Sequence, residues 1–337
     1  MTDSEISLLA KTGTYRRKKL NGKVRETHIS WVILNGRYAF KFKKPVKLPF
    51  LNSSTLALRR KLCRQEVSLN RRLTDIYLDV LPVRRYGDRY EIGGSSGRTI
   101  DYTVRMRRLD EKDRLDNRLR TDSVPHSQIR KLADVIANFH NSAMRIEQSA
   151  PALPWRELFN EISDYRKFVE GKSGSRYVKI INDTIRASDL FLRCHENRLE
   201  ERARAGFIRD VHGDLHCGNV FLGKDPIIFD CIEFDKRYRQ IDILYEIAFL
   251  IMDMEALGRK KCADELLKQY LKTCACVQTQ EDFKILDYFK CLRANVRAKV
   301  HLISAREKRN VREVRSHLTQ ANRYLRLMSK YSLMDNE

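Results

Sequence analysis

A short polar stretch around residue 214 and the apolar run that follows it constrain this chain most. Asp214 stands two residues after His212, and Asn219 stands five residues after Asp214. The apolar run 226–229 then ends at Asp230, as a buried strand that delivers a carboxylate at its end would. One carboxylate can orient or deprotonate a hydroxyl, and an amide and a second carboxylate can hold magnesium on the phosphates of a nucleotide. The pattern therefore predicts phosphoryl transfer.

The spacing His-x-Asp-x-x-x-x-Asn is also that of a kinase catalytic loop. We expect Asp214 to be the catalytic base, and Asn219 and Asp230 to be magnesium ligands, because Mg²⁺ prefers hard oxygen donors. His216 lies two residues beyond the base, where it could approach the transferring phosphate or be structural. We expect His212 to hold the loop through hydrogen bonds rather than to transfer protons.

The composition indicates an ordered cytoplasmic protein. The longest wholly apolar run covers residues 247–252, far short of the ~20 residues that a membrane helix needs, so no membrane span is expected. The first residues have neither the basic region nor the apolar region of a secretory signal. The eight cysteines follow no disulfide or zinc-knuckle spacing, and His212, His216 and Cys217 lack well-placed further ligands for zinc.

The formal net charge of +22 is high for a cytoplasmic enzyme. Such a field attracts nucleic acid, anionic surfaces or phosphorylated metabolites, although a solvated basic surface is the simpler explanation. Between Asp225 and Glu255, eight acidic residues stand against three basic ones. The candidate site is therefore locally acidic, as a metal-binding cleft would be.

The first third of the chain is expected to be rich in β-structure with one helix. Residues 28–34 and 37–43 flank Asn35-Gly36, which favours a hairpin closed by a type I′ turn. Alternation along the second strand puts Tyr38, Phe40 and Phe42 on one face, and Ala39, Lys41 and Lys43 on the other.

A helix is expected over 55–73, with Ser53 or Ser54 as its N-cap. Its expected apolar stripe consists of Leu62, Leu69 and Leu73. Glu66 falls inside that stripe, where an unpaired carboxylate would be costly. Lys41 or Lys43 from the hairpin is the expected partner, and Lys41–Glu66 is the candidate for the ion pair that positions the phosphates; a basic strand edge is the alternative.

The remaining patterns predict a bilobal α+β protein with a protein-kinase-like fold. Residues 1–109 form a small β-rich N-lobe, 110–126 a linker, and 127–337 a larger, mostly helical C-lobe that carries the catalytic loop. Further strands are expected at 90–92 and 99–107. The helical stretches are 127–146, 155–204 with a break near 171–174, 242–257, 260–274, 282–304 and 311–331.

The sequence resembles the aminoglycoside phosphotransferase/choline kinase-like superfamily, and within it one bacterial branch. The resemblance implies transfer from ATP with Mg²⁺, with Asp214 as base, Asn219 and Asp230 as metal ligands, and Lys41 paired with Glu66 at the phosphates. It also implies an adenine site at the strand 104–109, which includes Met106. The matching pieces are 26–32, 38–46, 70–73, 212–219, 227–234 and 293–300.

Three departures from the pattern matter. Cys231-Ile232 replaces the Phe-Gly of protein kinases, so a kinase-type activation switch is not expected. No glycine-rich loop precedes Ile29, so Thr27, His28 and Ser30 would have to cover the phosphates. The P-loop pattern of the ATP-binding domain that some members carry is absent, so no such domain is expected.

The acceptor is left open. A positively charged protein repels polycations at long range, which favours a small hydroxylated acceptor, and an anionic one could bind Lys290, Arg293 and Arg297 on one helical face. A solvated stripe is the alternative for these three residues. The rival hypotheses are a kinase acting on protein or RNA, with nucleic acid a less favoured partner, and a pseudokinase-like nucleotide-binding module.

Overall fold

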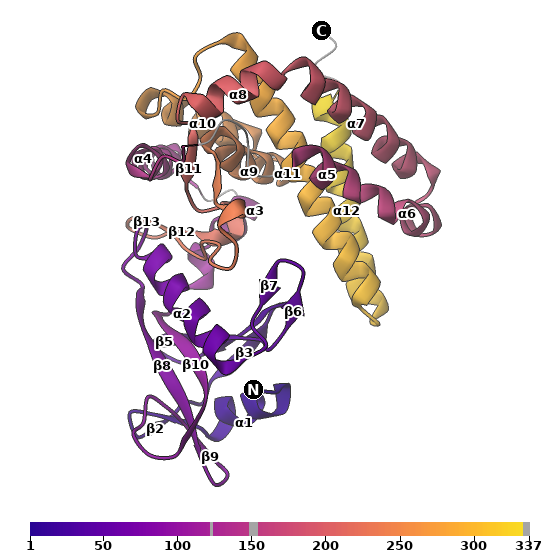
Figure 1. Ribbon diagram of the computed structural model, residues 1–337. Helices are drawn as coiled ribbons and strands as arrows, with labels where there is room; N and C mark the ends of the chain where they lie inside the picture. The colour runs from indigo at the N-terminus through magenta and orange to yellow at the C-terminus, as the bar shows by residue number, and fades with distance from the viewer. Residues whose placement is uncertain (122–123, 148–153, 333–337) are drawn as a thin grey trace. The chain divides into compact units, whose positions relative to one another are not determined.

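The computed structural model describes residues 1–121, 124–147 and 154–332 (Figure 1). The chain forms two compact units. The first unit contains residues 1–113 and 227–236, and the second contains 114–226 and 237–337. The segment with Asp230 therefore packs with the N-terminal part of the chain, although it follows residues 212–219 in sequence.

The first unit is built on an eight-stranded sheet with the order β2-β1-β9-β8-β10-β5-β4-β3. Its strands are antiparallel neighbours except for β1 and β9, which pair in parallel. A separate small hairpin joins β6 (Lys47–Leu48) to β7 (Leu51–Asn52). The strands of the large sheet are β1 (Thr14–Tyr15), β2 (Lys18–Lys19), β3 (Lys23–Glu26), β4 (Ser30–Leu34), β5 (Tyr38–Lys43), β8 (Tyr77–Tyr86), β9 (Arg89–Ile92) and β10 (Arg98–Arg107).

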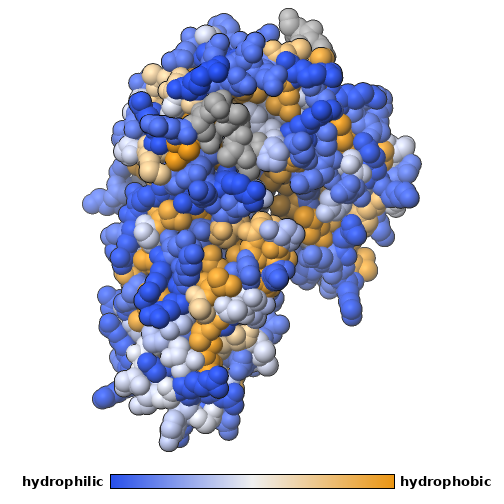
Figure 2. Space-filling model, viewed as in Figure 1, coloured by the Kyte–Doolittle hydropathy of each residue, from blue (hydrophilic) through white to orange (hydrophobic). Residues whose placement is uncertain are grey.

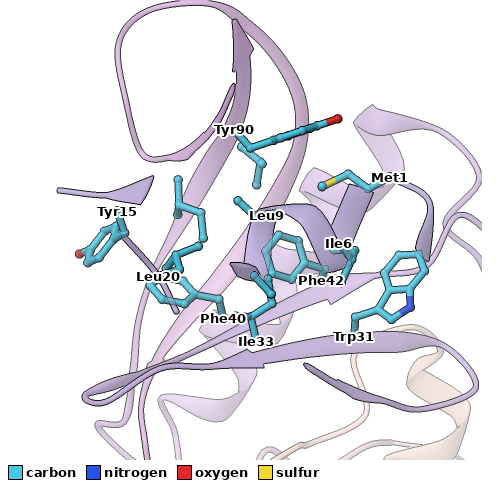
Figure 3. Packing of buried hydrophobic residues seen from close by; sticks show 13 residues of the cluster. Met1, Ile6, Leu9, Tyr15, Leu20, Trp31, Ile33, Phe40, Phe42 and Tyr90 are labelled. Carbon is cyan, nitrogen blue, oxygen red and sulfur yellow. The ribbon is translucent and has the colours of Figure 1, made fainter. Parts of the chain in front are cut away.

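A second helix, α1 (Asp3–Thr12), was not expected. Thr2 and Glu5 cap it reciprocally, and this Thr-x-x-Glu pattern before apolar residues was a readable start signal. The helix packs on the face of the sheet that carries Phe40 and Phe42, as Figure 3 shows. The cluster comprises Met1, Ile6, Leu9, Ala10, Tyr15, Leu20, Trp31, Ile33, Phe40, Phe42, Val83, Tyr90 and Ile92.

The helix expected over 55–73 is α2 (Leu56–Asn70), and it packs against β8 and β10. The predicted N-cap was wrong, because Thr55 accepts the capping hydrogen bond from Leu58 N at 3.3 Å. The predicted stripe was partly wrong as well. Leu62 is buried, whereas Leu69 and Leu73 are half-buried, and the buried face instead follows Cys63, Glu66, Val67 and Asn70.

The expected hairpin exists as β4 and β5, but its turn is not type I′. That turn requires positive φ at both central residues, and neither Asn35, Gly36 nor Arg37 has it. Asn35 Oδ1 instead accepts hydrogen bonds from the backbone N–H groups of Arg37 and Tyr38, at 3.1 and 2.8 Å. The ten-residue strand β8 was missed, because Pro82 in its middle reads as a strand breaker.

The second unit is mainly helical, and the four C-terminal helices lie where the periodicity predicted them. Figure 2 shows hydrophilic side chains over much of the visible surface. No helix in the described ranges is long and apolar enough to cross a membrane. The main helices are α3 (Leu115–Arg120), α4 (His126–Ser142), α5 (Trp155–Asn160), α6 (Arg166–Ser173), α7 (Ser175–Cys194), α8 (Glu196–Arg204), α9 (Ile243–Ala256), α10 (Lys260–Thr273), α11 (Gln280–Glu307) and α12 (Val311–Ser332).

Short elements complete the chain. The break predicted near 171–174 is present, since α6 ends at Ser173 and is followed by Gly174, whose φ of 94° is not helical. The short strands and turns are η1 (Glu111–Asp113), η2 (Glu161–Tyr165), β11 (Ile208–Asp210), η3 (Cys217–Asn219), β12 (Val220–Leu222), β13 (Pro226–Ile228), η4 (Lys236–Tyr238) and β14 (Gln240–Asp242).

Candidate active site

Lys41 and Glu66 meet in the first unit. Lys41 Nζ donates to Glu66 Oε1 at 2.8 Å and also contacts Asp230 Oδ1. Burial alone would lower the pKa of Lys41, but the carboxylates of Asp230 and Glu66 raise it well above its ordinary value. The lysine is therefore a fixed positive charge.

Lys43 also binds Glu66, so the carboxylate is shared between two lysines. Lys43 Nζ lies 2.6 Å from Glu66 Oε2 and also contacts Glu233 Oε1. Burial would raise the pKa of Glu66, but Lys41 and Lys43 together lower it to about 2. The side chains of Lys43 and Glu233 are only 2% and 5% exposed, whereas that of Asp230 is 39% exposed. Of the three carboxylates in this cluster, only Asp230, which contacts Lys41, is exposed to solvent.

Asp230 is held in an unusual backbone conformation. Its φ of 68° lies in the left-handed region, which a residue with a Cβ rarely adopts and which has to be supported by its neighbours. Its backbone N–H donates to Tyr77 Oη at 3.1 Å, and the next N–H, of Cys231, donates to Asn70 Oδ1 at 2.9 Å. Asn70 and Tyr77 are buried, and neither was among the predicted site residues.

Met106 packs in a partly open apolar cluster on the Lys41 face of the sheet. Its buried members include Ala39, Cys63, Val67 and Val104. Several other apolar side chains of this cluster stay half-exposed, so the first unit presents an apolar wall beside Lys41. These side chains are Val32, Leu34, Val80, Tyr102, Leu109, Ile227 and Phe229.

Thr27 and Ser30 form the turn between β3 and β4. Their hydroxyls lie 2.8 Å apart, and Thr27 Oγ1 also accepts from the backbone N–H of Ser30 at 3.0 Å. Ser30 is 2% exposed. Both hydroxyls serve the turn, so phosphate contact there would fall to backbone groups rather than to these side chains.

In the second unit, the candidate loop 211–219 follows β11, which pairs with β14. Val211 N donates to Arg239 O at 2.8 Å, which brings the start of the loop close to the 238–239 backbone. Gly213 has a φ of 89°, and a Cβ there would lie 2.6 Å from the carbonyl oxygen of Tyr238. This position therefore requires glycine, where protein kinases usually have arginine.

Two buried carboxylates of α9 hold the loop by its backbone. Glu246 accepts from His212 N and Gly213 N, both at 2.7 Å, and Asp253 accepts from Cys217 N at 3.0 Å. A basic residue also binds this backbone: Arg293 Nη2 donates to Gly213 O at 3.3 Å. These anchoring residues were not predicted, although two acids in the otherwise apolar stretch 243–254 were a visible signal.

The side chains of Asp214, His216 and Asn219 converge. Asn219 Nδ2 donates to Asp214 O and Oδ2, at 3.0 and 3.2 Å. His216 Nε2 lies 3.5 Å from Asp214 Oδ2. His216 Nδ1 accepts from Gly218 N at 3.0 Å, so a neutral imidazole carries its proton on Nε2, the atom that faces Asp214. His212 Nδ1 likewise accepts from Asp214 N, at 3.2 Å.

These contacts keep Asp214 ionised. Burial would raise the pKa of Asp214, but His216 and His212, together with Arg297, hold it well below its usual range. Its side chain is 42% exposed. The result is an ionised, oriented and accessible carboxylate, which can accept a hydrogen bond from a bound hydroxyl.

Most buried acids of the acidic stretch 225–255 are engaged in contacts other than metal binding. Its buried acids are already committed: Glu233 to Lys43, Asp242 to Arg202, and Glu246 and Asp253 to the loop backbone. Across the described residues, no three His, Cys, Asp or Glu side chains gather in a metal-binding group.

Asn219 and Asp230 nevertheless suit magnesium, each within its own unit. Asn219 uses its Nδ2 to reach Asp214, and no described residue donates to its Oδ1. Asp230 meets Lys41 through Oδ1 and is part-exposed. Hard oxygen ligands in small number are what Mg²⁺ needs when phosphates and waters complete its shell.

Comparison with known proteins gives the family. The sequence model of the phosphotransferase enzyme family matches residues 54–281. An uncharacterized protein of Mycobacterium tuberculosis is 31% identical over 290 residues, which cover 83% of this chain and 54% of the relative. A protein of Mycobacterium bovis matches equally well. The chain thus spans about half the length of these curated relatives.

Solved structures agree on the fold. A choline/ethanolamine kinase family protein from Mesorhizobium loti aligns with a TM-score of 0.50 at 14% identity, covering 97% of this chain and 98% of that one. An ethanolamine kinase of Plasmodium vivax aligns with a TM-score of 0.51 at 12% identity, covering 90% and 81%. The predicted α+β kinase-like fold and the resemblance to the aminoglycoside phosphotransferase/choline kinase-like superfamily are confirmed. The chain belongs to the phosphotransferase enzyme family.

Proposed function

We propose that this protein transfers the γ-phosphate of ATP to a hydroxyl of a small molecule, with Asp214 as the base. The observation that carries the proposal is the set of contacts around Asp214, an accessible and ionised carboxylate oriented by His216 and Asn219. Such a group need only orient the hydroxyl and take its proton late in the transfer. Family membership supports the reaction class.

The first unit supplies the nucleotide contacts in this proposal. The half-exposed apolar wall around Met106 would pack against the adenine, and Lys41, fixed by Glu66, would bind the phosphates. The turn at Thr27 and Ser30 would approach the phosphates through its backbone. A lysine suits this task as a compact charge with three donors.

Asn219 and Asp230 are the proposed magnesium ligands. A bound Mg²⁺ would neutralise charge on the phosphates, while this chain's residues position the reactants. His216, with its Nε2 proton toward Asp214, holds the base in place and could also donate to the transferring group. The expected activity is Mg-dependent consumption of ATP that rises when an acceptor is added.

Lys41 and Lys43 can be separated by experiment. We expect Lys41→Met to lower kcat/KM for MgATP at least about tenfold, which corresponds to ~1.4 kcal/mol of transition-state stabilisation. Lys43→Met is the matched variant. Its lysine is enclosed by Glu66 and Glu233, so its loss should mainly lower the free energy of unfolding.

Steady-state ADP release and urea unfolding, measured on both variants, test this assignment. If Lys43→Met reduces kcat/KM more than Lys41→Met while remaining as stable as the unmodified protein, then Lys43 is the phosphate lysine. Absence of any Mg-dependent ATP turnover, with a broad panel of alcohols, amino alcohols and sugars, would reject the proposed function itself.

A further inference from the structure

The three basic residues on one face of α11 have different roles. Lys290 Nζ is paired with Glu255 and Asp287, each at 3.0 Å. Arg293 donates to the backbone oxygens of Gly213 and Tyr245. These two cations are therefore committed to the fold and are not available to an acceptor, contrary to the sequence-based hypothesis. Of the three residues, Arg297 is the remaining candidate for binding an anionic acceptor.

Arg297 is half-buried and lacks an ion-pair partner in the described part of the chain. Its Nε donates to Tyr324 Oη at 3.5 Å, and that hydroxyl in turn donates to Asp253 Oδ1 at 2.9 Å. Tyr324 thus fixes one edge of the guanidinium. The two Nη groups have no acceptor among the described residues, and a half-buried guanidinium with unused donors is a typical oxyanion site.

Two histidines lie beside Tyr324, and they offer ring N–H groups rather than charge. His301 stacks on Tyr324 with the ring centroids 5.7 Å apart, and its Nδ1 lies 3.2 Å from Nδ1 of His317. Burial and the charge of Arg297, with smaller effects of His317 and Arg323, lower the pKa of His301 to about 3. Arg323 on α12 is half-buried and also forms no ion pair with a described residue.

Burial would lower the pKa of Arg297, whereas Tyr324, Asp253 and Asp214 raise it, although neither carboxylate forms an ion pair with the guanidinium. Asp253 is the buried acid of the cluster, and its two oxygens are occupied by Cys217 N and Tyr324 Oη. Asp214 is the other, and its role is that of the proposed base. Hydrogen bonds connect Arg297 through Tyr324 and Asp253 to the backbone of Cys217, which stands three residues after Asp214. An acceptor lying here would therefore meet a carboxylate at one end and a guanidinium at the other.

We propose that Arg297, with Arg323 and the His301–His317 pair, binds a phosphate group of the acceptor while the acceptor's hydroxyl lies at Asp214. The acceptor is then a molecule that is already phosphorylated, and the enzyme adds a second phosphate. This inference rests on the proposed phosphotransfer for its biological meaning. The anion site itself belongs wholly to the second unit and can be tested without turnover.

Inorganic phosphate is the probe for the site. Histidine ring resonances of ¹³C-labelled full-length protein, assigned with His301→Gln and His317→Gln, should shift saturably as phosphate is added, and acetate should shift them less. Arg297→Gln should weaken the apparent affinity at least about tenfold, and Arg297→Lys should restore part of it. Arg326→Gln is the control on α12, because Arg326 is exposed and donates to the hydroxyl of Tyr177.

Kinetics supply a second, independent readout. ADP release with matched sugars and sugar phosphates should favour the phosphorylated member of each pair, and Arg297→Lys should raise the KM for that acceptor more than it lowers kcat. Shifts that do not saturate, or that Arg297→Gln and Arg326→Gln affect equally in folded protein, would overturn the inference.

The two proposals can fail separately. If Asp214-dependent ATP turnover is found but phosphate binding ignores Arg297, the anion site is wrong and the phosphotransfer stands. If phosphate binds through Arg297 and no turnover occurs with any acceptor, the anion site stands and the phosphotransfer is wrong.

Discussion

Replacing Asp214 with asparagine should lower kcat by about 10²–10⁴-fold. The amide keeps the shape of the carboxylate, and its oxygen can still accept from Asn219 Nδ2, so the loop should keep its conformation. It cannot accept the proton of the attacking hydroxyl. Steady-state ADP release with the best acceptor of the panel measures the effect, and circular dichroism checks the fold.

Asp225→Asn is the matched control for this variant. Asp225 lies in the same unit as Asp214 and the variant loses the same charge, but the Asp225 side chain is 67% exposed and pairs with Lys131. We expect it to retain nearly full kcat. If Asp214→Asn kept activity within a few-fold of the unmodified protein, Asp214 could not be the base, and the phosphoryl-transfer mechanism assigned to this loop would have to be abandoned.

The largest loss of stability is expected from Arg202→Met. Arg202 is completely buried and donates to both oxygens of Asp242, at 2.8 and 2.9 Å, and to Asp282 at 2.9 Å. Methionine fills much of the volume but leaves two buried carboxylates without this partner. Breaking a buried ion pair from one side costs about 3–5 kcal/mol. Urea unfolding of the full chain, followed by a signal from the second unit, measures this loss in the free energy of unfolding.

Two further variants make the test specific. Arg204→Met, two residues along α8, removes a side chain that is 57% exposed and pairs with Glu200, so the change should stay within about 0.5 kcal/mol. Adding Asp242→Asn to Arg202→Met should recover part of the loss, because one stranded charge is removed. An Arg202→Met protein as stable as Arg204→Met would show that the pair contributes nothing to folding.

The parts of the site that follow from local sequence were predictable. Strand alternation placed Lys41 and Lys43 on one face, and an acid inside a helical stripe pointed to Glu66, because both patterns depend on residues close in sequence. The choice between Lys41 and Lys43 was not decidable in this way. It depends on Glu233 and Asp230, which come from a segment nearly two hundred residues away in the chain.

Other features depend on long-range contacts or on backbone geometry. The role of Glu246 is invisible in its own helix, since it acts on the backbone of a loop over thirty residues earlier. The hairpin turn was mispredicted because the Asn35 side chain, rather than two positive φ values, closes it. The strand β8 was missed because Pro82 is tolerated within it.

The sharing of Glu66 between two lysines bears on how this protein could be controlled. In protein kinases, the helix that carries the corresponding glutamate can move, and its position switches activity. Here Glu66 holds Lys41 and Lys43 together, and Asn70 of the same helix binds the backbone beside Asp230. Any outward swing of α2 would strand several buried charges at once. Such a movement of α2 would therefore be energetically costly in this protein.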